Sequence, residues 1–405
     1  MEHRPLYENL WKDLAEQKAM VFLSGPRQTG KTTIARQIAE QNPASVYTNW
    51  DIIPDRKRIH ASPYFFEETN RMDNKRPLVI FDEIHKYRLW KNYLKGVYDK
   101  FNQDFQFMVL GSGRLDVFQK GGDSLAGRYY QAHVFPLTVA ELGQVRREFL
   151  DFIKDFYDAN LCGSRLTNIW EDLSNYTGFP EPFFAASQTN YERWSQTYGH
   201  QVIREDVRDL TQIKNIDAVE SLFFLLPSRV GSLLSVASLS RDLQVAFNSV
   251  KEWLEVFERF YLIFRISPWT KKVSRAITKE PKLYLMDYGQ IPDQAARFEN
   301  MVAMELLRAV HNWNDRGLGR FSLHFLRDKD GQEVDFFVAN KNVPVFMVES
   351  KLGEEEPSKA LRSFQNVFHV PAVQVINKSG IQKIFSNGPD KIMIMTAADW
   401  LAGLP

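Results

Sequence analysis

A glycine-rich loop between two regular elements is the feature that most constrains the fold of this chain. The apolar run Val21-Phe22-Leu23 predicts a strand, and residues 33–40 predict a helix. The loop between them matches the pattern G-x-x-x-x-G-K-S/T and is followed by Thr33; its residues are Gly25, Pro26, Arg27, Gln28, Thr29, Gly30, Lys31 and Thr32. A chance glycine-rich turn is the alternative, but both flanking elements argue against it.

Loops of this kind bind phosphate groups. Their glycines let backbone N–H groups close around the phosphates, and the N-terminus of the following helix faces the negative charge. We therefore predict ATP as the ligand, with Lys31 bridging the β and γ oxygens and the Thr32 hydroxyl as a ligand of Mg²⁺.

An acidic pair closes another apolar run. Residues 78–81 predict a buried strand, and Asp82 and Glu83 follow at its carboxyl end, where ligands of open α/β sheets gather. Asp82 is predicted to hold Mg²⁺ through water. Glu83 is predicted to orient or deprotonate the attacking water, so that binding becomes hydrolysis.

Two further residues are candidates for the same site. Ser112 follows the predicted strand 105–110 and would place a small polar side chain beside the γ-phosphate. Arg128 could neutralise transition-state charge in its own subunit or in a neighbouring one. The alternative for Arg128 is an ordinary surface or salt-bridged arginine.

The order of the expected strands and helices, together with the length of the sequence, predicts an α/β fold with three domains: 1–142, 143–280 and 281–405. In the first, strands alternating with helices predict a parallel, doubly wound sheet; the expected strands are 19–24, 45–51, 78–82, 105–110 and 133–137. The second is helical, and residues 235–266 outline a winged helix of two short helices and a strand. The third combines expected strands with two helices; its elements are strands 282–286, 322–326, 333–338 and 345–349, and helices 297–310 and 357–367.

The chain resembles the prokaryotic AAA-type ATPases that join an N-terminal P-loop domain to a C-terminal domain of unknown function. The matching stretches span most of the chain; they are 25–33, 79–83, 110–112, 125–128, 135–137, 178–180, 282–289 and 333–336. The resemblance implies an AAA-type P-loop ATPase sheet, a winged-helix middle and a restriction-endonuclease-like α/β end. One departure is Ser350, at a position that such families often fill with Val.

The C-terminal part carries a second set of candidate residues. Asp335, followed by Glu349-Ser350-Lys351, is similar to the D-(x)n-E-x-K core of the PD-(D/E)XK nucleases. Residues two apart in a strand share a face, so Glu349 and Lys351 should point the same way, as should Glu333 and Asp335.

These carboxylates predict a metal-dependent site. Glu299 lies within the apolar stripe of its helix, where a carboxylate needs a partner. We predict that Glu299, Asp335 and Glu349 hold a divalent ion, with Lys351 nearby. The alternatives are acids that serve only structure or DNA binding, and an amphipathic hairpin with solvated charges.

Composition limits the partners. The 51 basic and 50 acidic residues give a net charge of +1, so nucleic-acid binding would depend on a local patch. The candidate patch is a basic loop bordering the last domain; its residues are Lys271, Lys272, Arg275, Lys279 and Lys282. A single cysteine and the lack of a long apolar run or a signal segment lead us to expect a cytoplasmic protein without a membrane partner.

Three hypotheses for function remain open. The first is an ATPase whose last domain engages DNA or RNA and cleaves it. The second is an ATP switch whose last domain is a non-catalytic module that recognises DNA or protein. The third, resembling STAND switches, would hydrolyse ATP slowly and form a homo-oligomer with ATP.

Overall fold

The computed structural model describes residues 3–69, 76–111, 125–145, 147–158, 163–207, 213, 215–270 and 279–405. The chain divides into two compact units, one of residues 1–135 with 259–261, the other of residues 136–258 with 262–405. Within the described residues, no helix is both long enough and apolar enough to cross a lipid bilayer.

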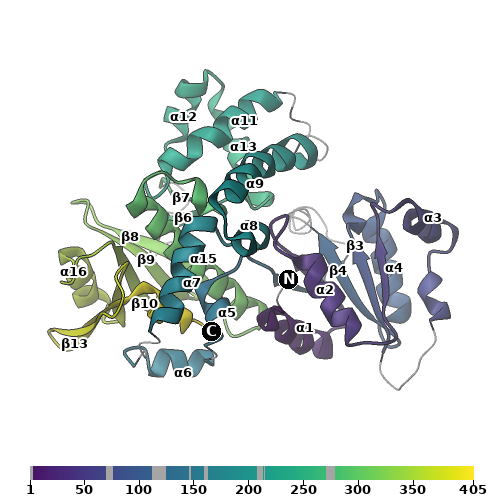
Figure 1. Ribbon diagram of the computed structural model, residues 1–405, viewed down its shortest axis with the longest axis horizontal. Coiled ribbons are helices and arrows are strands. Elements are labelled where there is room, and N and C mark those ends of the chain that lie inside the picture. Colours follow the sequence, from purple (N-terminus) through teal and green to yellow (C-terminus); the bar gives the residue numbers. More distant parts are fainter. Residues whose placement is uncertain are drawn as a thin grey trace. The chain divides into compact units, whose positions relative to one another are not determined.

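The first unit is built on a parallel sheet (Figure 1). Its strands are β1 (Met20–Ser24), β2 (Val46–Asn49), β3 (Leu78–Asp82), β4 (Gln106–Gly111) and β5 (Tyr130–His133). Its helices are α1 (Pro5–Gln17), α2 (Lys31–Glu40), α3 (Ile53–Ala61) and α4 (Trp90–Phe101). The strand order is β2-β3-β4-β1-β5, and every neighbouring pair is parallel. The predicted doubly wound parallel sheet is therefore confirmed.

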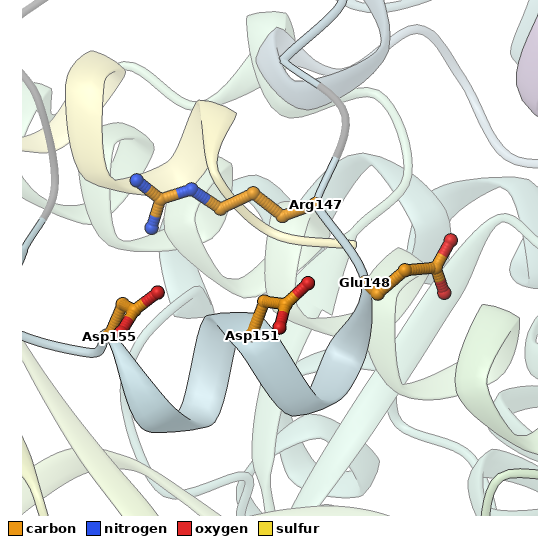
Figure 2. Close-up of a pocket in the computed structure, with 4 residues that line it drawn as sticks. All are labelled: Arg147, Glu148, Asp151 and Asp155. Atoms are coloured by element: carbon orange, nitrogen blue, oxygen red, sulfur yellow. The ribbon is translucent and has the colours of Figure 1, made fainter.

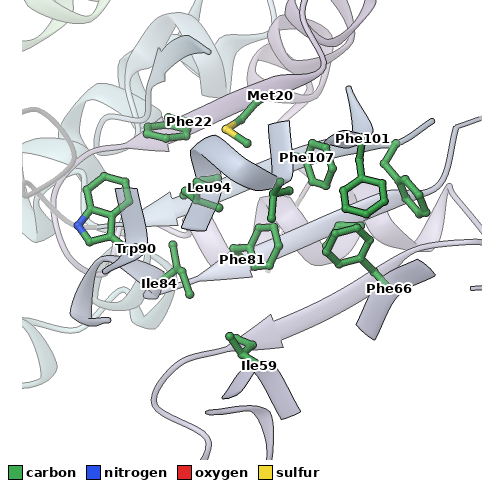
Figure 3. Packing of buried hydrophobic residues seen from close by; sticks show 14 of the residues in the cluster. Met20, Phe22, Ile59, Phe66, Phe81, Ile84, Trp90, Leu94, Phe101 and Phe107 are labelled. Atoms are coloured by element: carbon green, nitrogen blue, oxygen red, sulfur yellow. The ribbon is translucent and has the colours of Figure 1, made fainter. Parts of the chain in front are cut away.

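The two faces of this sheet bury alternate residues of the same strands. Phe22, Phe81 and Phe107 pack under α4, together with Phe66 (Figure 3). Their neighbours in the strands face the other way, against α1 and α2. Because side chains alternate along a strand, helices on both faces need the nearly continuous apolar runs that the sequence has.

The second unit begins with helices and ends with a mixed sheet. Its helices are α5 (Val139–Gly143), α6 (Phe149–Lys154), α7 (Ser164–Tyr176), α8 (Pro180–Ala185), α9 (Gln188–Gln201), α11 (Ile216–Leu225), α12 (Val236–Leu243), α13 (Phe247–Arg259), α15 (Gln294–Asp315), α16 (Lys359–Phe368) and α17 (Ala397–Ala402). Its strands are β6 (Ile263–Pro268), β7 (Lys282–Leu285), β8 (Phe321–Arg327), β9 (Glu333–Asn340), β10 (Val343–Lys351), β11 (Ala372–Ile376), β12 (Gln382–Asn387) and β13 (Asp390–Thr396). The strand order is β12-β13-β11-β10-β9-β8-β6-β7. The predicted helical middle and C-terminal sheet are confirmed.

The strand that was expected to complete a winged helix is β6. It follows α12 and α13 as predicted and pairs antiparallel with β7, while Leu233 bridges to Lys282. Its other end pairs with β8, so β6 is also part of the C-terminal sheet. The winged helix stays a prediction. The domain boundary at 280 also stays a prediction, although the strands on either side of it, β6 and β7, pair with each other.

The candidate carboxylates lie on the core elements of this second sheet. β9 and β10 are neighbouring antiparallel strands in its interior. Helix α15 begins at Gln294, where the side chain of Asp293 accepts a hydrogen bond from Ala296 N and caps the helix. These elements place Glu299, Asp335 and Glu349 on rigid parts of the fold.

Candidate functional sites

The phosphate loop lies between β1 and α2, as the sequence predicts. Gly30 precedes the helix with a φ of 87°, a left-handed conformation that glycine adopts without strain. Gly25 is the tighter position, because a Cβ atom there would lie 2.0 Å from the Val134 carbonyl oxygen. The structure therefore explains why glycine is needed at both positions.

Lys31 and its neighbours are held within the loop itself. The Lys31 side chain is largely buried, and its Nζ donates to the carbonyl oxygens of Gly25 (2.9 Å) and Pro26 (2.5 Å). Thr29 Oγ1 donates to Pro26 O at 2.9 Å, and the buried Arg4 guanidinium donates to Thr29 O at 2.6 Å. These contacts give the loop a defined shape with the ammonium at its centre.

Thr32 and Asp82 meet although they are far apart in the sequence. Thr32 Oγ1 donates to Asp82 Oδ2 at 2.8 Å, and Tyr47 OH donates to the same oxygen at 2.7 Å. Burial raises the pKa of Asp82, and the two hydrogen bonds partly offset that effect. A hydroxyl and a buried carboxylate side by side are the hard oxygen ligands that suit Mg²⁺.

Glu83 has different surroundings. Its backbone φ of 55° is unusual for a residue other than glycine, and conformations of this kind concentrate at functional sites. Its carboxylate lies 3.2 Å from Lys86 Nζ and 3.6 Å from His85 Nε2, and a quarter of the side chain is exposed. Lys86 in turn pairs with Asp51 at 2.6 Å.

Of the remaining candidates of the first unit, Arg128 pairs with a residue of α4. Arg128 Nε donates to Asp99 Oδ1 on α4 at 2.6 Å, which is the salt-bridged alternative. Its predicted role in neutralising transition-state charge stays a prediction. Ser112 lies outside the described residues. Tyr47 is the residue that sequence reasoning missed, and the signal for it is its place on β2 beside the strand that carries Asp82.

In the second unit, the candidate carboxylates surround a lysine. Lys282 Nζ, at the start of β7, lies 3.0 Å from Glu299 Oε1, 2.5 Å from Glu333 Oε1 and 3.5 Å from Asp335 Oδ1. The sequence assigned Lys282 to a candidate basic patch for nucleic acid, but only 2% of the residue is exposed, so it cannot contribute to a surface patch. Of that candidate patch, Lys271, Lys272 and Arg275 lie outside the described residues.

Glu349 and Lys351 share a face of β10, and Lys351 Nζ lies 2.9 Å from Glu349 Oε1. Asp335 Oδ2 accepts hydrogen bonds from the Ser350 backbone (2.9 Å) and hydroxyl (2.7 Å). We call Glu299, Glu333, Asp335, Glu349, Lys282 and Lys351 the acid–lysine cluster. Burial, together with the charge of Asp335, raises the pKa of Glu299 to about 7 and also raises that of Glu349.

The metal site predicted at Glu299, Asp335 and Glu349 stays a prediction. Among the described residues, no group of three or more His, Cys, Asp or Glu side chains is placed to hold an ion. The ammonium of Lys282 contacts two of the three predicted ligands, Glu299 and Asp335. Ser350, the departure from the family pattern, holds Asp335 through its hydroxyl.

A surface pocket of about 350 Å³ lies elsewhere in the second unit, where Arg147 extends over helix α6 (Figure 2). The other residues lining it are Glu148, Asp151 and Asp155. Arg147 Nη2 donates to the Asp158 carbonyl at 3.1 Å. Among the described residues that line this pocket, none is a candidate site residue.

Comparison with known proteins finds a family match for the N-terminal part of the chain. The family model described as an AAA domain matches residues 17–143. This stretch is similar to AAA domains, and we call it the AAA-type domain. Two further models match much of the remaining chain, and both describe domains of unknown function: DUF8612 over residues 167–296 and DUF4143 over residues 295–391.

Relatives and solved structures are similar to this chain at low identity. An uncharacterized protein of Mycobacterium tuberculosis is 23% identical over 359 residues, covering 85% of this chain and 73% of its own length. One of Methanocaldococcus jannaschii is 21% identical, with 87% and 79% covered. A Walker-type ATPase of Pyrococcus abyssi aligns with a TM-score of 0.43 at 14% identity, covering 71% of this chain and 94% of its own. Cdc6p from Pyrobaculum aerophilum aligns with a TM-score of 0.29 at 12% identity, covering 78% and 94%.

Proposed function

We propose that the AAA-type domain binds ATP with Mg²⁺ and hydrolyses it. The observation that carries this proposal is the hydrogen bond between Thr32 Oγ1 and Asp82 Oδ2 at 2.8 Å. It joins the last residue of the phosphate loop, which directly follows Lys31, to the carboxylate that ends β3. Thr32 and Asp82 would hold the ion, which would neutralise charge on the phosphates.

The remaining steps fall to side chains of the loop and of the end of β3. Lys31 would exchange its loop carbonyls for β- and γ-phosphate oxygens, with which a cation interacts more strongly. Glu83 would orient the attacking water and accept its proton, since its carboxylate is partly exposed while that of Asp82 is buried. Ser112 and Arg128 would complete the site as sensor and charge-neutralising arginine.

For the second unit, we propose that it engages nucleic acid under the control of ATP hydrolysis. The support is the placement of Asp335, Glu349 and Lys351 on neighbouring strands, which is what the nuclease-like resemblance implies. Lys282 contacts two of the predicted metal ligands, which argues against metal-dependent cleavage. That contact favours the alternative of a STAND-like ATP switch whose C-terminal domain is a non-catalytic binding module.

The ATP-binding proposal is tested by calorimetry on Lys31→Ala. We expect roughly a 100-fold loss of ATP affinity, because the variant lacks the cation that reaches the β and γ phosphates. Lys57→Ala, which changes an exposed lysine of the same domain, is the matched control and should bind ATP as the natural chain does. Equal affinity in both variants would contradict the proposal.

The nucleic-acid proposal is tested by fluorescence anisotropy with labelled DNA and RNA, with and without ATP. Binding that changes on ATP addition supports it. If neither nucleic acid binds under either condition, the nucleic-acid proposal is wrong, and the alternative of a protein-recognising module remains.

A further inference from the structure

Lys282 is a buried cation with an unusual number of carboxylate neighbours. Its Nζ contacts Glu299, Glu333 and Asp335, which come from α15 and from two positions of β9. The side chain of Lys282 is 3% exposed, so water cannot replace these contacts. An isolated ammonium at such a depth would lose its proton, but the three carboxylates raise the pKa of Lys282 well above its ordinary value.

Each of these carboxylates is also fixed by a second partner. Glu299 Oε1 accepts a hydrogen bond from Tyr284 OH at 2.7 Å, and Glu333 Oε2 accepts one from Arg327 at 2.8 Å. Asp335 is fixed by the backbone and hydroxyl of Ser350. These second partners come from three different strands, so the carboxylates are preorganised around the ammonium.

A divalent ion and this ammonium would compete for the same oxygens. Mg²⁺ or Mn²⁺ would need contacts of roughly 2.0–2.2 Å to the carboxylates, which are the oxygens that Lys282 Nζ already approaches within 2.5–3.5 Å. Both cations at once would place like charges a few ångströms apart in a buried site, which is strongly unfavourable.

We infer that Lys282 is the resident cation of the acid–lysine cluster, filling the position that a divalent metal would take and excluding that metal from the folded chain. The cluster is then complete without metal, and its fixed charges are those of its own side chains. This inference goes beyond ATP hydrolysis and requires no nucleic-acid partner, so it can fail or hold independently of both proposals above.

The test counts Mn²⁺ ions bound to the full chain without nucleotide, by the loss of the free Mn²⁺ electron paramagnetic resonance signal. Lys282→Met should bind about one more ion per chain than the natural protein, because an uncharged side chain of similar length leaves the carboxylates without their cation. Adding Asp335→Asn to Lys282→Met should abolish that gain. Weak binding at the phosphate loop is common to all variants and cancels in the comparison.

Arg327→Met is the matched control. It also removes one positive charge paired with Glu333, but from a side chain that is 42% exposed and paired at the other oxygen of that carboxylate. It should bind no more Mn²⁺ than the natural chain. An equal gain in Arg327→Met would show that any loss of positive charge admits an ion, and would overturn the inference.

Two measurements keep the inference falsifiable if Lys282→Met folds poorly. Lys282→Met with Glu333→Gln removes one carboxylate along with the ammonium, and its thermal midpoint should rise when Mn²⁺ is added. In the chain that retains Lys282, Asp335→Asn should leave Mn²⁺ binding unchanged. If Asp335→Asn instead lowers Mn²⁺ binding in that chain, or if no Lys282 variant gains an ion, Lys282 does not occupy a metal position.

Discussion

Two adjacent carboxylates at the end of β3 have opposite environments. Asp82 is buried and accepts hydrogen bonds from Thr32 and Tyr47, while Glu83 is partly exposed and paired with Lys86. The fixed carboxylate of Asp82 is suited to holding a metal ion, and the accessible carboxylate of Glu83 is suited to orienting a water molecule. The sequence alone predicts the pair, but it does not predict Tyr47, because this contact depends on which strands are neighbours.

Tyr47→Phe should lower the affinity for the Mg²⁺ that supports ATP hydrolysis. Burial, with the hydrogen bond to Asp82, raises the pKa of Tyr47 to about 12, so the hydroxyl stays protonated and donates at neutral pH. Losing a hydrogen bond to a charged group costs about 1.5–3 kcal/mol, so the half-saturating Mg²⁺ concentration should rise by roughly tenfold or more. Titrating Mg²⁺ in a phosphate-release assay measures it.

Tyr93→Phe is the control, since Tyr93 OH donates to the Pro63 carbonyl, away from Asp82. An unchanged Mg²⁺ requirement in Tyr47→Phe would mean that Tyr47 does not position Asp82.

At the scale of elements, the phosphate loop contains a position where the backbone of a neighbouring segment limits the residue type to glycine. Gly25 has a φ of 153° and lies against the backbone that follows β5, so a side chain there must displace main-chain atoms. The motif predicts the glycine, but the strand beside it can be identified only from the structure.

Gly25→Ala should destabilise the AAA-type domain by roughly 2–4 kcal/mol and lower its ATP affinity, because the new Cβ would overlap the Val134 carbonyl. Gly127→Ala is the control: its φ is also positive, at 76°, but nothing lies within 4 Å of the new atom. Chemical denaturation measures both. Equal destabilisation by the two variants would show that backbone conformation, not the close contact, is the cause.

Sequence patterns locate most helices and strands, but they fail where contacts between distant segments determine the end of a strand or the burial of a residue. The predicted strands 78–82 and 282–286 agree with β3 and β7 to within one residue. The predicted strand 133–137 is instead β5 at Tyr130–His133, and the apolar residues after His133 are buried but lie beyond the end of the strand. Lys282 was misplaced for a similar reason, since its burial depends on carboxylates that are distant in the sequence.

At the scale of the whole molecule, the free energy of unfolding should depend on pH through the buried Glu305. Its Oε1 accepts a hydrogen bond from Val139 N at 2.6 Å, and burial raises the pKa of Glu305 from 4.5 to about 8. Above pH 4.5 the unfolded chain releases this proton, whereas the folded chain keeps it until about pH 8. Protonated Glu305 therefore contributes stability that is fully present below pH 4.5 and is lost as pH rises through about 8.

Glu305→Gln should remove that loss, because the amide keeps a carbonyl acceptor for Val139 N and has no proton to release. Between pH 5 and 8 the free energy of unfolding of the second unit should fall by about 1–3 kcal/mol less in the variant than in the natural chain. Urea denaturation across this range measures it, with the exposed Glu181→Gln as control. Parallel pH profiles for Glu305→Gln and the natural chain would contradict this assignment.

The most direct test of the account is ATP turnover by Glu83→Gln, measured as phosphate release together with calorimetric ATP binding. The glutamine keeps the size of the side chain but cannot take a proton from water, so ATP affinity should stay within about threefold of the natural value while turnover falls by roughly 100-fold or more. Turnover at the natural rate, with ATP bound normally, would contradict the role of Glu83 and with it the proposed mechanism of hydrolysis.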